Sequence, residues 1–189
     1  NMSDLKNYCQ GNESRYLLKS RRFGYDGKNQ LKCNSRIDLL EKLLSECSCI
    51  IEEIVDFSTE VSLVCVRQED NNIVFYPLIE NFHKDGILRY SKFPYINKEL
   101  QDTAEKYGKE LLNYFKYVGV LVVEFFVSKD GKLVANEMAP RVHNSGHWSI
   151  EGSSTSQFEL HVRAITGDLD DKPINFKPSL MLNLSLIHI

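Results

Sequence analysis

The chain has 189 residues, of which 42% are hydrophobic and 26% are charged, as is typical of a globular protein with a sizeable core. A formal net charge of −3 at pH 7 argues against a general nucleic-acid binder, although a local basic patch for a small phosphate ligand remains compatible with it. The five cysteines form no CxxC pair, which favours reduced thiols and a cytoplasmic location. No signal peptide or membrane span is predicted, because the most apolar run, 118–127, is short and contains Glu124.

The first predicted elements form a hairpin followed by a helix. The segment "RYLLKS" (15–20) is typical of a strand, and a glycine-punctuated loop (21–30) leads to a returning strand at 30–34. Ser35 then resembles the N-cap of a helix whose apolar stripe extends to about Glu46.

The rest of the chain alternates β-rich runs with two helices. Strands are expected at 49–55, 60–68, 72–81, 86–93, 120–127 and 133–139, with a turn at 129–132. Asn97 caps a predicted helix that extends to about Phe115, and a second helix is expected from Ser153 to Thr166, with Gly167 as its C-terminal cap. The pattern predicts an α+β fold with a mostly antiparallel sheet.

The ends of the chain suggest a piece of a longer protein. The sequence begins with Asn1 rather than Met and stops within an apolar run, "LMLNLSLIHI". A domain rarely ends while its last strand is incomplete, so we expect flanking segments.

The turn at 129–132 predicts two carboxylates on one face of a hairpin. With Asp130-Gly131 as a two-residue type I′ loop, Glu124 and Glu137 would sit directly opposite each other. Their expected neighbours on that face are Val122, Phe126, Leu133 and Ala135. Like charges in such a place destabilise the hairpin unless a cation lies between them, and Mg²⁺ suits two carboxylates plus phosphate oxygens. The alternative is that each glutamate meets its own Lys or Arg at a sheet edge.

Two further segments have the chemistry of a nucleotide site. Lys19 precedes a loop that contains Arg21, Arg22, Gly24 and Gly27, and glycines let backbone N–H groups turn toward phosphate oxygens. An exposed basic turn is the alternative. Backbone groups near Glu52 to Val55 suit a base edge and Glu60 suits ribose hydroxyls, unless this is a strand followed by a solvated acidic turn.

The segment "NEMAPRVHNSGHWS" (136–149) concentrates charged and polar groups on a predicted loop. Pro140 removes a backbone donor and Asn144-Ser145-Gly146 is typical of a turn. Residues on loops serve binding or catalysis more often than packing, but most polar loops are simply solvated.

Taken in order, these pieces resemble a known family. The motifs are "LLKSRRFGYDGKNQ", "EEIVDFSTEVSLV", "VFYPLIENFHKDGILR", "YVGVLVVEFFV" and "NEMAPRVHNSGHWSIEGSSTSQFELHVRAITG". Together they closely resemble the ATP-grasp region of the 5-(carboxyamino)imidazole ribonucleotide synthases of de novo purine synthesis, over roughly residues 15–185. The resemblance implies an ATP-grasp fold of two α+β lobes, a small one at 1–50 that is incomplete at its N-terminus and a large one at 51–189. The family's N-terminal and C-terminal domains would be missing from the chain.

The resemblance also implies a ligand set and a role for each matching position. It implies ATP and Mg²⁺ as cofactors, aminoimidazole ribonucleotide and bicarbonate as substrates, no nucleic-acid or membrane partner, and a homodimer in the full-length protein. On the nucleotide side it places Lys19, Gly24, Tyr25, Asp26, Gly27, Lys28, Asn29, Gln30, Glu52, Glu53, Ile54, Val55, Glu60, His83, Asn136 and Glu137. Glu124 and Glu137 match the Mg²⁺ ligands. Tyr25, Lys28, Arg141, His143, Asn144 and Ser145 match the bicarbonate and ribonucleotide site, with Arg141, His143 and Lys28 as catalytic candidates.

Two residues depart from the family pattern, which reads GYDGRGQ where this chain has Lys28 and Asn29. Lys keeps the charge of Arg but loses its bidentate fork, and Asn tolerates a left-handed backbone better than most residues. The implied reaction is phosphorylation of bicarbonate by ATP to carboxyphosphate, followed by carboxyl transfer to the ribonucleotide's amine. The alternatives are another ATP-grasp ligase, such as a formate-using transformylase or a biotin carboxylase, and a nucleotide-binding module without turnover.

Overall fold

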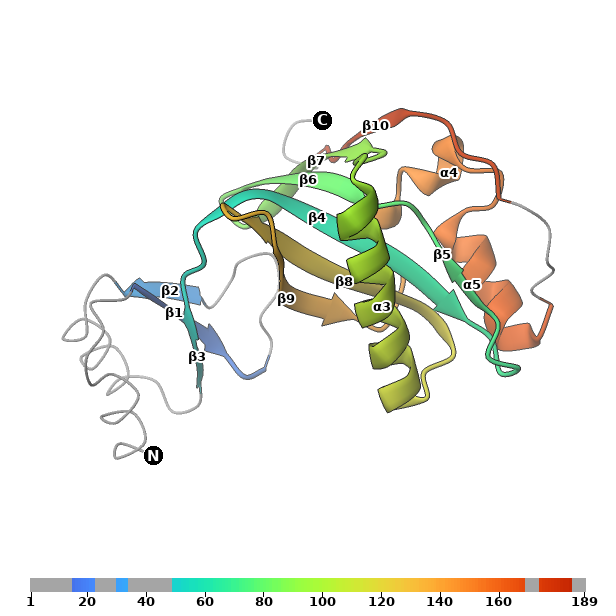
Figure 1. The fold of residues 1–189 in the computed structure, drawn as a ribbon, viewed down its shortest axis with the longest axis horizontal. Helices are drawn as coiled ribbons and strands as arrows, with labels where there is room; N and C mark the ends of the chain where they lie inside the picture. Colours follow the sequence, from blue (N-terminus) through green and yellow to red (C-terminus); the bar gives the residue numbers. More distant parts are fainter. Residues whose placement is uncertain (1–14, 23–29, 34–48, 169–173, 185–189) are drawn as a thin grey trace. The chain divides into compact units, whose positions relative to one another are not determined.

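The computed structural model describes residues 15–22, 30–33, 49–168 and 174–184. The chain divides into two compact units, Asn1–Val55 with Asp85–Ile87, and Asp56–Lys84 with Leu88–Ile189, which are described in turn (Figure 1). The predicted helix at 35–46 lies outside the described residues. So do six candidates of the glycine loop, Gly24, Tyr25, Asp26, Gly27, Lys28 and Asn29.

The first unit contains a three-stranded antiparallel sheet in the order β2-β1-β3. Its strands are β1 (Tyr16–Ser20), β2 (Gln30–Cys33) and β3 (Cys49–Glu53). Tyr16, Leu18 and Cys33 are buried together, which follows from the two-residue alternation of strand side chains. β1 and β2 pair antiparallel, with Tyr16 opposite Cys33 and Lys19 opposite Gln30, so the predicted hairpin is confirmed. A lobe boundary at residue 50 would fall within β3, whereas the units divide after Val55 because β3 pairs with β1.

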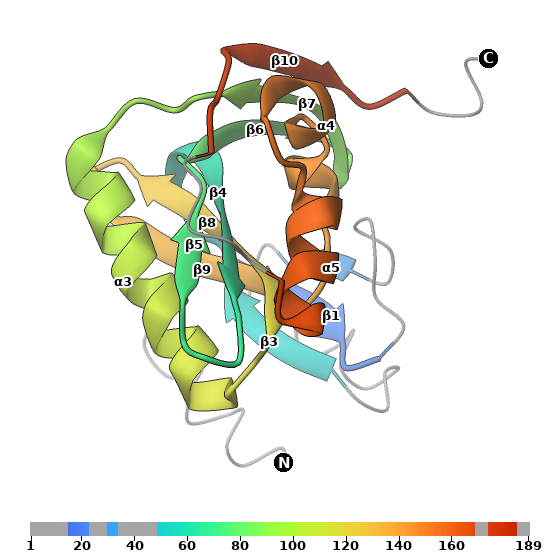
Figure 2. The same ribbon diagram turned by 90° about the vertical axis from the view of Figure 1, so that its right-hand side faces the viewer.

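The second unit is built on a seven-stranded sheet in the order β10-β7-β6-β4-β8-β9, with β5 paired to β4. The strands are β4 (Phe57–Arg67), β5 (Ile73–Phe75), β6 (Ile79–Lys84), β7 (Ile87–Phe93), β8 (Gly119–Ser128), β9 (Leu133–Ala139) and β10 (Ser179–Leu182). The strand predicted at 72–81 is split into β5 and β6, and Pro77, which cannot donate to a ladder, lies in the break. Helices cover both faces of the sheet, which explains why β4 and β8 are nearly continuous apolar runs (Figure 2).

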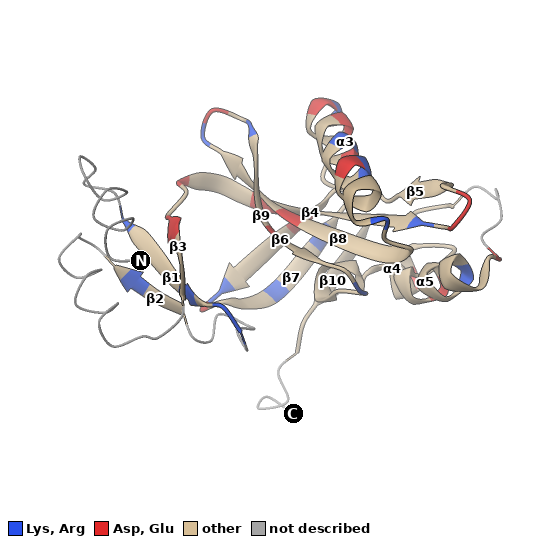
Figure 3. Ribbon diagram, turned by 90° about the horizontal axis from the view of Figure 1, so that it is seen from below, with Lys and Arg blue, Asp and Glu red and all other residues tan. Residues whose placement is uncertain are grey.

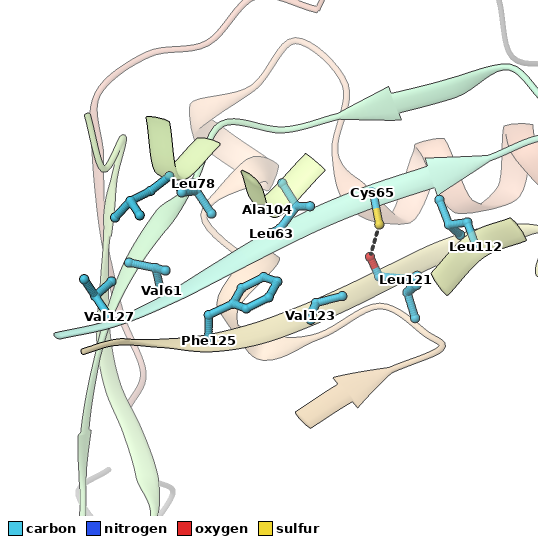
Figure 4. Packing of buried hydrophobic residues seen from close by; sticks show 11 residues of the cluster. Val61, Leu63, Cys65, Leu78, Ala104, Leu112, Leu121, Val123, Phe125 and Val127 are labelled. Atoms are coloured by element: carbon cyan, nitrogen blue, oxygen red, sulfur yellow. Dashed lines mark hydrogen bonds between the residues drawn. The ribbon is translucent and has the colours of Figure 1, made fainter. Parts of the chain in front are cut away.

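One face of the sheet packs against α3 (Lys98–Phe115), which Asn97 caps by accepting from the Leu100 N–H at 3.1 Å. The core on this side includes Val61, Leu63, Cys65, Phe125 and Val127 (Figure 4). The buried line of α3 passes through Leu100, Ala104, Gly108 and Leu112, whereas Tyr107 and Phe115 are exposed. Gly108 permits this close approach, because a Cβ there would lie 2.9 Å from Leu63 Cδ2.

Two hydrogen bonds from one side chain of α3 hold the interrupted strand. Gln101 Oε1 accepts from the Leu78 N–H at 2.7 Å, and Gln101 Nε2 donates to the Tyr76 carbonyl at 3.2 Å. Cys65 on the same side donates its thiol to the Leu121 carbonyl at 3.2 Å, and burial raises its pKa to about 12. This thiol therefore stays protonated and serves packing.

The opposite face packs against α4 (Ser149–Gly152) and α5 (Gln157–Thr166) through Trp148, Leu160 and Ala164. The helix predicted from Ser153 begins later, at Gln157, because Ser156 caps it by accepting from the Glu159 N–H. Its predicted end is confirmed, since Gly167 adopts a left-handed φ of 75°. The short α4 was not predicted. Among the described residues, no helix is long and apolar enough to cross a membrane.

Candidate functional site

The β8–β9 hairpin places Glu124 directly opposite Glu137, as the sequence predicts. The predicted two-residue turn, however, is wrong. A type I′ loop needs positive φ at both central residues, and among the described residues Gly131 has φ of 80° whereas Asp130 is not in that region. Ser128 and Lys132 instead close a three-residue loop, residues 129–131, with the Ser128 N–H donating to the Lys132 carbonyl at 2.9 Å. Within the loop, the Gly131 N–H donates to the Ser128 carbonyl, also at 2.9 Å.

A β-bulge in β9 reconciles this turn with the glutamate pair. The three-residue loop sets Val127 opposite Leu133 and Phe125 opposite Ala135, one residue away from the predicted register. Asn136 is then the extra residue, after which Glu124 faces Glu137. Leu133 and Ala135 were therefore assigned to the wrong face. They share the α3 side with Phe125 and Val127, because the bulge shifts the alternation of side chains.

Glu124 is the buried member of the pair and ends a row of hydrogen-bonded polar side chains that crosses the sheet. Ser91 Oγ donates to Asn81 Oδ1 at 2.8 Å, and Asn81 Nδ2 donates to Ser62 Oγ at 2.5 Å. Ser62 Oγ in turn donates to Glu124 Oε1 at 3.5 Å. All four residues are buried, so this row of hydrogen bonds fixes the side chain of Glu124. Glu137, in contrast, is exposed. Figure 3 shows the acidic residues of β4, β8 and β9 in red.

The charges around Glu124 are unbalanced. Burial raises the pKa of Glu124 to about 7; His83 lowers it, and the charges of Glu137 and Glu60 raise it. His83 Nδ1 lies 2.5 Å from Glu60 Oε2. Burial lowers the pKa of His83, but the hydrogen bond to Glu60 and the nearby carboxylates outweigh this, and the pKa is raised. The carboxylates of Glu60, Glu124 and Glu137 all act on the His83 imidazole, and together they give this part of the site an excess of negative charge.

That excess fits a bound cation, although the protein supplies few ligands. Within the described part of the chain, no group of three or more His, Cys, Asp or Glu side chains is arranged to hold a metal ion. The opposed pair Glu124 and Glu137 matches Mg²⁺, which commonly takes one or two carboxylates and completes its octahedron with water and phosphate oxygens. The donor set is therefore suited to a metal that arrives with a nucleotide.

The loop after β9 brings one of the candidate residues at 141–145, His143, beside Glu124. His143 Nδ1 lies 3.6 Å from Glu124 Oε1 and 2.9 Å from Ser145 Oγ. Arg141 is exposed and its Nη1 donates to the Val142 carbonyl at 2.9 Å. Asn144 and Ser145 begin a short 3₁₀ helix (Asn144–Gly146), in which Asn144 is exposed and Ser145 is buried. The next residues serve packing: His147 stacks on Phe158 and Trp148 on Phe93.

In the first unit, Lys19 and Glu52 form an ion pair, with Lys19 Nζ 2.7 Å from Glu52 Oε2. The two are diagonal neighbours on the same face of adjacent strands, because Glu52 pairs with Leu17, two residues from Lys19. Gln30 and Glu53 are exposed, and Ile54 and Val55 are half-buried just after β3. The Ile54 N–H donates to the Arg15 carbonyl at 2.9 Å. The roles predicted for these residues toward a nucleotide stay predictions.

Sequence reasoning missed the side chains that support the candidate residues. Ser62, Asn81 and Ser91 hold Glu124, and Gln157 holds the backbone of His143. A weak signal was available for two of them. Ser62 and Asn81 are polar residues inside apolar strand segments, and a buried polar group needs a partner.

The comparisons with known proteins all indicate the same family. The model of the ATP-grasp domain matches residues 1–158. The N5-carboxyaminoimidazole ribonucleotide synthase of Escherichia coli (strain K12) is 48% identical over 171 residues, which is 89% of this chain and 47% of that protein. The structure of N5-carboxyaminoimidazole synthetase from Staphylococcus aureus with ADP superposes with a TM-score of 0.86, at 36% identity over 96% of this chain and 49% of that one.

A structure of N5-carboxyaminoimidazole synthase from Aspergillus clavatus with ADP and 5-aminoimidazole ribonucleotide has a TM-score of 0.81 at 27% identity, covering 96% of this chain and 48% of that one. The chain thus spans about half the length of the relatives that it matches. The antiparallel sheet of the second unit, the opposed glutamates and the family model agree, and the predicted fold is confirmed: this chain belongs to the ATP-grasp family.

Proposed function

We propose that the full-length protein carboxylates 5-aminoimidazole ribonucleotide with bicarbonate at the expense of ATP. The products would be N5-carboxyaminoimidazole ribonucleotide, ADP and phosphate, with carboxyphosphate as the intermediate. The similar proteins from Escherichia coli and Staphylococcus aureus carry the name of this activity, and the similar structure from Aspergillus clavatus contains ADP and the ribonucleotide. The similarity extends over most of this chain, which supports assigning the same activity to the full-length protein.

The observation that carries the proposal is the direct approach of His143 to Glu124, at 3.6 Å. It joins the glutamate pair, which ATP-grasp ligases share, to the segment "APRVHNSGHW", which separates this family from other ATP-grasp ligases. A metal held by this pair would therefore lie next to the residues proposed for bicarbonate.

In this proposal, Glu124 and Glu137 hold Mg²⁺, which neutralises the charge of the nucleotide phosphates when it is bound. Arg141 is the clamp for the oxyanions of bicarbonate and carboxyphosphate, since its fork can make two parallel charge-assisted hydrogen bonds. His143 holds the same anions in line or moves a proton. Its position on a short segment pinned by hydrogen bonds supports orientation of the reactants, which lowers the entropic part of the barrier.

The nucleotide side of the proposal follows the family positions. Lys19 would hold phosphates, backbone groups from Glu52 to Val55 the adenine edge, and Glu60 the ribose, while His83 takes another position on the nucleotide side. Asn136 and Gln30 complete the nucleotide side, and Lys28 with Tyr25, Asn144 and Ser145 the substrate side. The ammonium group of Lys19 has three donors, so it can contact a phosphate while its ion pair with Glu52 remains. A homodimer of the full-length protein is part of the same proposal.

The test is ADP release by the purified full-length protein with aminoimidazole ribonucleotide, with and without bicarbonate. Release that requires both substrates, together with carboxylated ribonucleotide as product, is expected. Glu137→Gln serves as the matched negative control, because it removes one carboxylate from an exposed position. ADP release that depends on formate would instead indicate another ATP-grasp ligase. Nucleotide binding without ADP release would indicate a binding module.

A further inference from the structure

The side chain of Gln157, in the first turn of α5, is bonded to both backbone groups of His143. Gln157 Oε1 accepts from the His143 N–H at 3.0 Å, and Gln157 Nε2 donates to the His143 carbonyl at 2.7 Å. Gln157 is fully buried, although a glutamine side chain costs free energy to bury unless its amide is hydrogen-bonded. The two bonds resemble one rung of a β-ladder, made by a side chain in place of a strand.

The space for this side chain is provided by neighbouring residues of the same loop. A Cβ on Gly146 would lie 2.4 Å from Gln157 Oε1 and 2.6 Å from its Cδ, so a larger residue there could not coexist with the bonds. Ser149 Oγ accepts from the Gln157 N–H at 2.9 Å and donates to the Gly146 carbonyl at 2.6 Å. The glutamine, the glycine and the serine thus form one closed set of contacts around the backbone of His143.

We propose that Gln157 is a positioning residue for the candidate site, which fixes the backbone of His143 so that its imidazole stays beside Glu124. The imidazole Nδ1 lies 2.9 Å from Ser145 Oγ, accepts from the Ser145 N–H at 3.4 Å and lies 3.6 Å from Glu124 Oε1. A side chain placed by its own backbone is set by the φ and ψ of that backbone, which the two amide bonds restrain. For its effect on turnover, this inference rests on the proposed function.

The test compares Gln157→Met with Gln101→Met in the full-length protein. Methionine has nearly the length of glutamine without its donor or acceptor. Gln101 makes the same kind of two-way contact with Leu78 and Tyr76 from α3, which packs on the other face of the sheet (Figure 2). Each variant loses two side chain–backbone hydrogen bonds, so a general loss of stability affects both. Gln157→Ala, which removes the same two bonds with a smaller side chain, is a second variant if the methionine variant folds poorly.

We expect Gln157→Met to lower kcat by about 10–100-fold, because small displacements of an aligned group have effects of that size. The KM for ATP should stay close to that of the wild type, since Gln157 does not contact the residues proposed for the nucleotide. Gln101→Met should keep kcat close to the wild-type value. The amide of His143 should exchange with deuterium faster in Gln157→Met than in either the wild type or Gln101→Met.

A double-mutant cycle tests the contact itself. Gly146→Ala should lower kcat in the wild type and much less in a Gln157→Ala background, where its Cβ no longer meets the amide. Equal kcat in Gln157→Met and Gln101→Met, or unchanged exchange at His143, would overturn the inference. If the wild type shows no ribonucleotide-dependent ADP release, the proposed function fails instead, and the exchange measurement alone then decides whether Gln157 holds the loop.

Discussion

Glu124→Gln should stabilise the metal-free protein at pH 8 while it abolishes turnover. Burial raises the pKa of Glu124 from 4.5 to about 7. Because the native pKa lies above the unfolded one, the stability present at low pH is lost as the pH rises through about 7. At roughly 1.4 kcal/mol for each pKa unit, the ionised carboxylate costs the folded state about 3 kcal/mol at pH 8 and less than about 1 kcal/mol at pH 5.

A neutral glutamine avoids this cost and can still accept a hydrogen bond from Ser62 Oγ. We therefore expect an increase in Tm of about 6–12 °C at pH 8 in EDTA, at roughly 2–4 °C per kcal/mol for a domain of this size, and little change at pH 5. Addition of Mg²⁺ and ATP should raise the Tm of the wild type and leave that of the variant nearly unchanged. Glu110→Gln, at an exposed position of α3, is the control for loss of a surface charge.

The assay is thermal unfolding followed by circular dichroism at both pH values, alongside ADP release. A variant that is no more stable than the wild type at pH 8 would refute the argument from burial. A gain of equal size at both pH values would refute the assignment of the effect to ionisation, because the carboxyl group of the wild type is protonated in the folded state at pH 5.

The remaining predictions concern Glu137, Arg141 and Asn81. Glu137→Gln should abolish ADP formation at limiting Mg²⁺ without a change in the circular dichroism spectrum; a normal rate would contradict its role as a metal ligand. Arg141→Lys should keep the affinity for ATP but lower single-turnover ADP formation at least about tenfold, because a point charge cannot replace a bidentate fork. A variant that loses only its affinity for ATP would show that Arg141 binds the nucleotide and not the bicarbonate-derived anion. Asn81→Ala should destabilise the fold by about 1–3 kcal/mol in urea titrations, since the buried hydroxyls of Ser62 and Ser91 lose a partner. No change in the midpoint would contradict this reading of the polar row.

Strands and their pairing were predictable wherever turn chemistry and apolar alternation agreed. The β1–β2 hairpin, the strands around residues 60–68 and 120–127, and the Asn97 cap all carry local signals of this kind. The opposed glutamates were also predicted, but the turn was not. Asp130-Gly131 is compatible with two loop lengths, and the choice between them depends on Ser128, whose hydroxyl bonds Asp130 and the Lys132 carbonyl.

The supporting network could not be predicted because its contacts join residues far apart in the chain. Ser62 and Asn81 come from different strands, and their side chains meet only when β4 and β6 pair in one register. Gln157 and His143 belong to a helix and a loop, and nothing in their spacing indicates a contact between a side chain and a backbone. The split of the strand at Pro77 had a visible cause in the sequence, and the later start of α5 at Gln157 follows from Ser156 as its cap.

The bulge at Asn136 has a consequence for the comparison of related chains by alignment. If Asn136 were absent, Ala135 would still pair with Phe125. Glu137 would then come directly after Ala135, would pair with Glu124, and would share a face of the sheet with it. A hairpin that lacks this residue therefore keeps its glutamate pair and loses only the local bend of β9. A gap of one residue at this point, which would ordinarily turn every later side chain of a strand to the other face, is here compatible with an unchanged site.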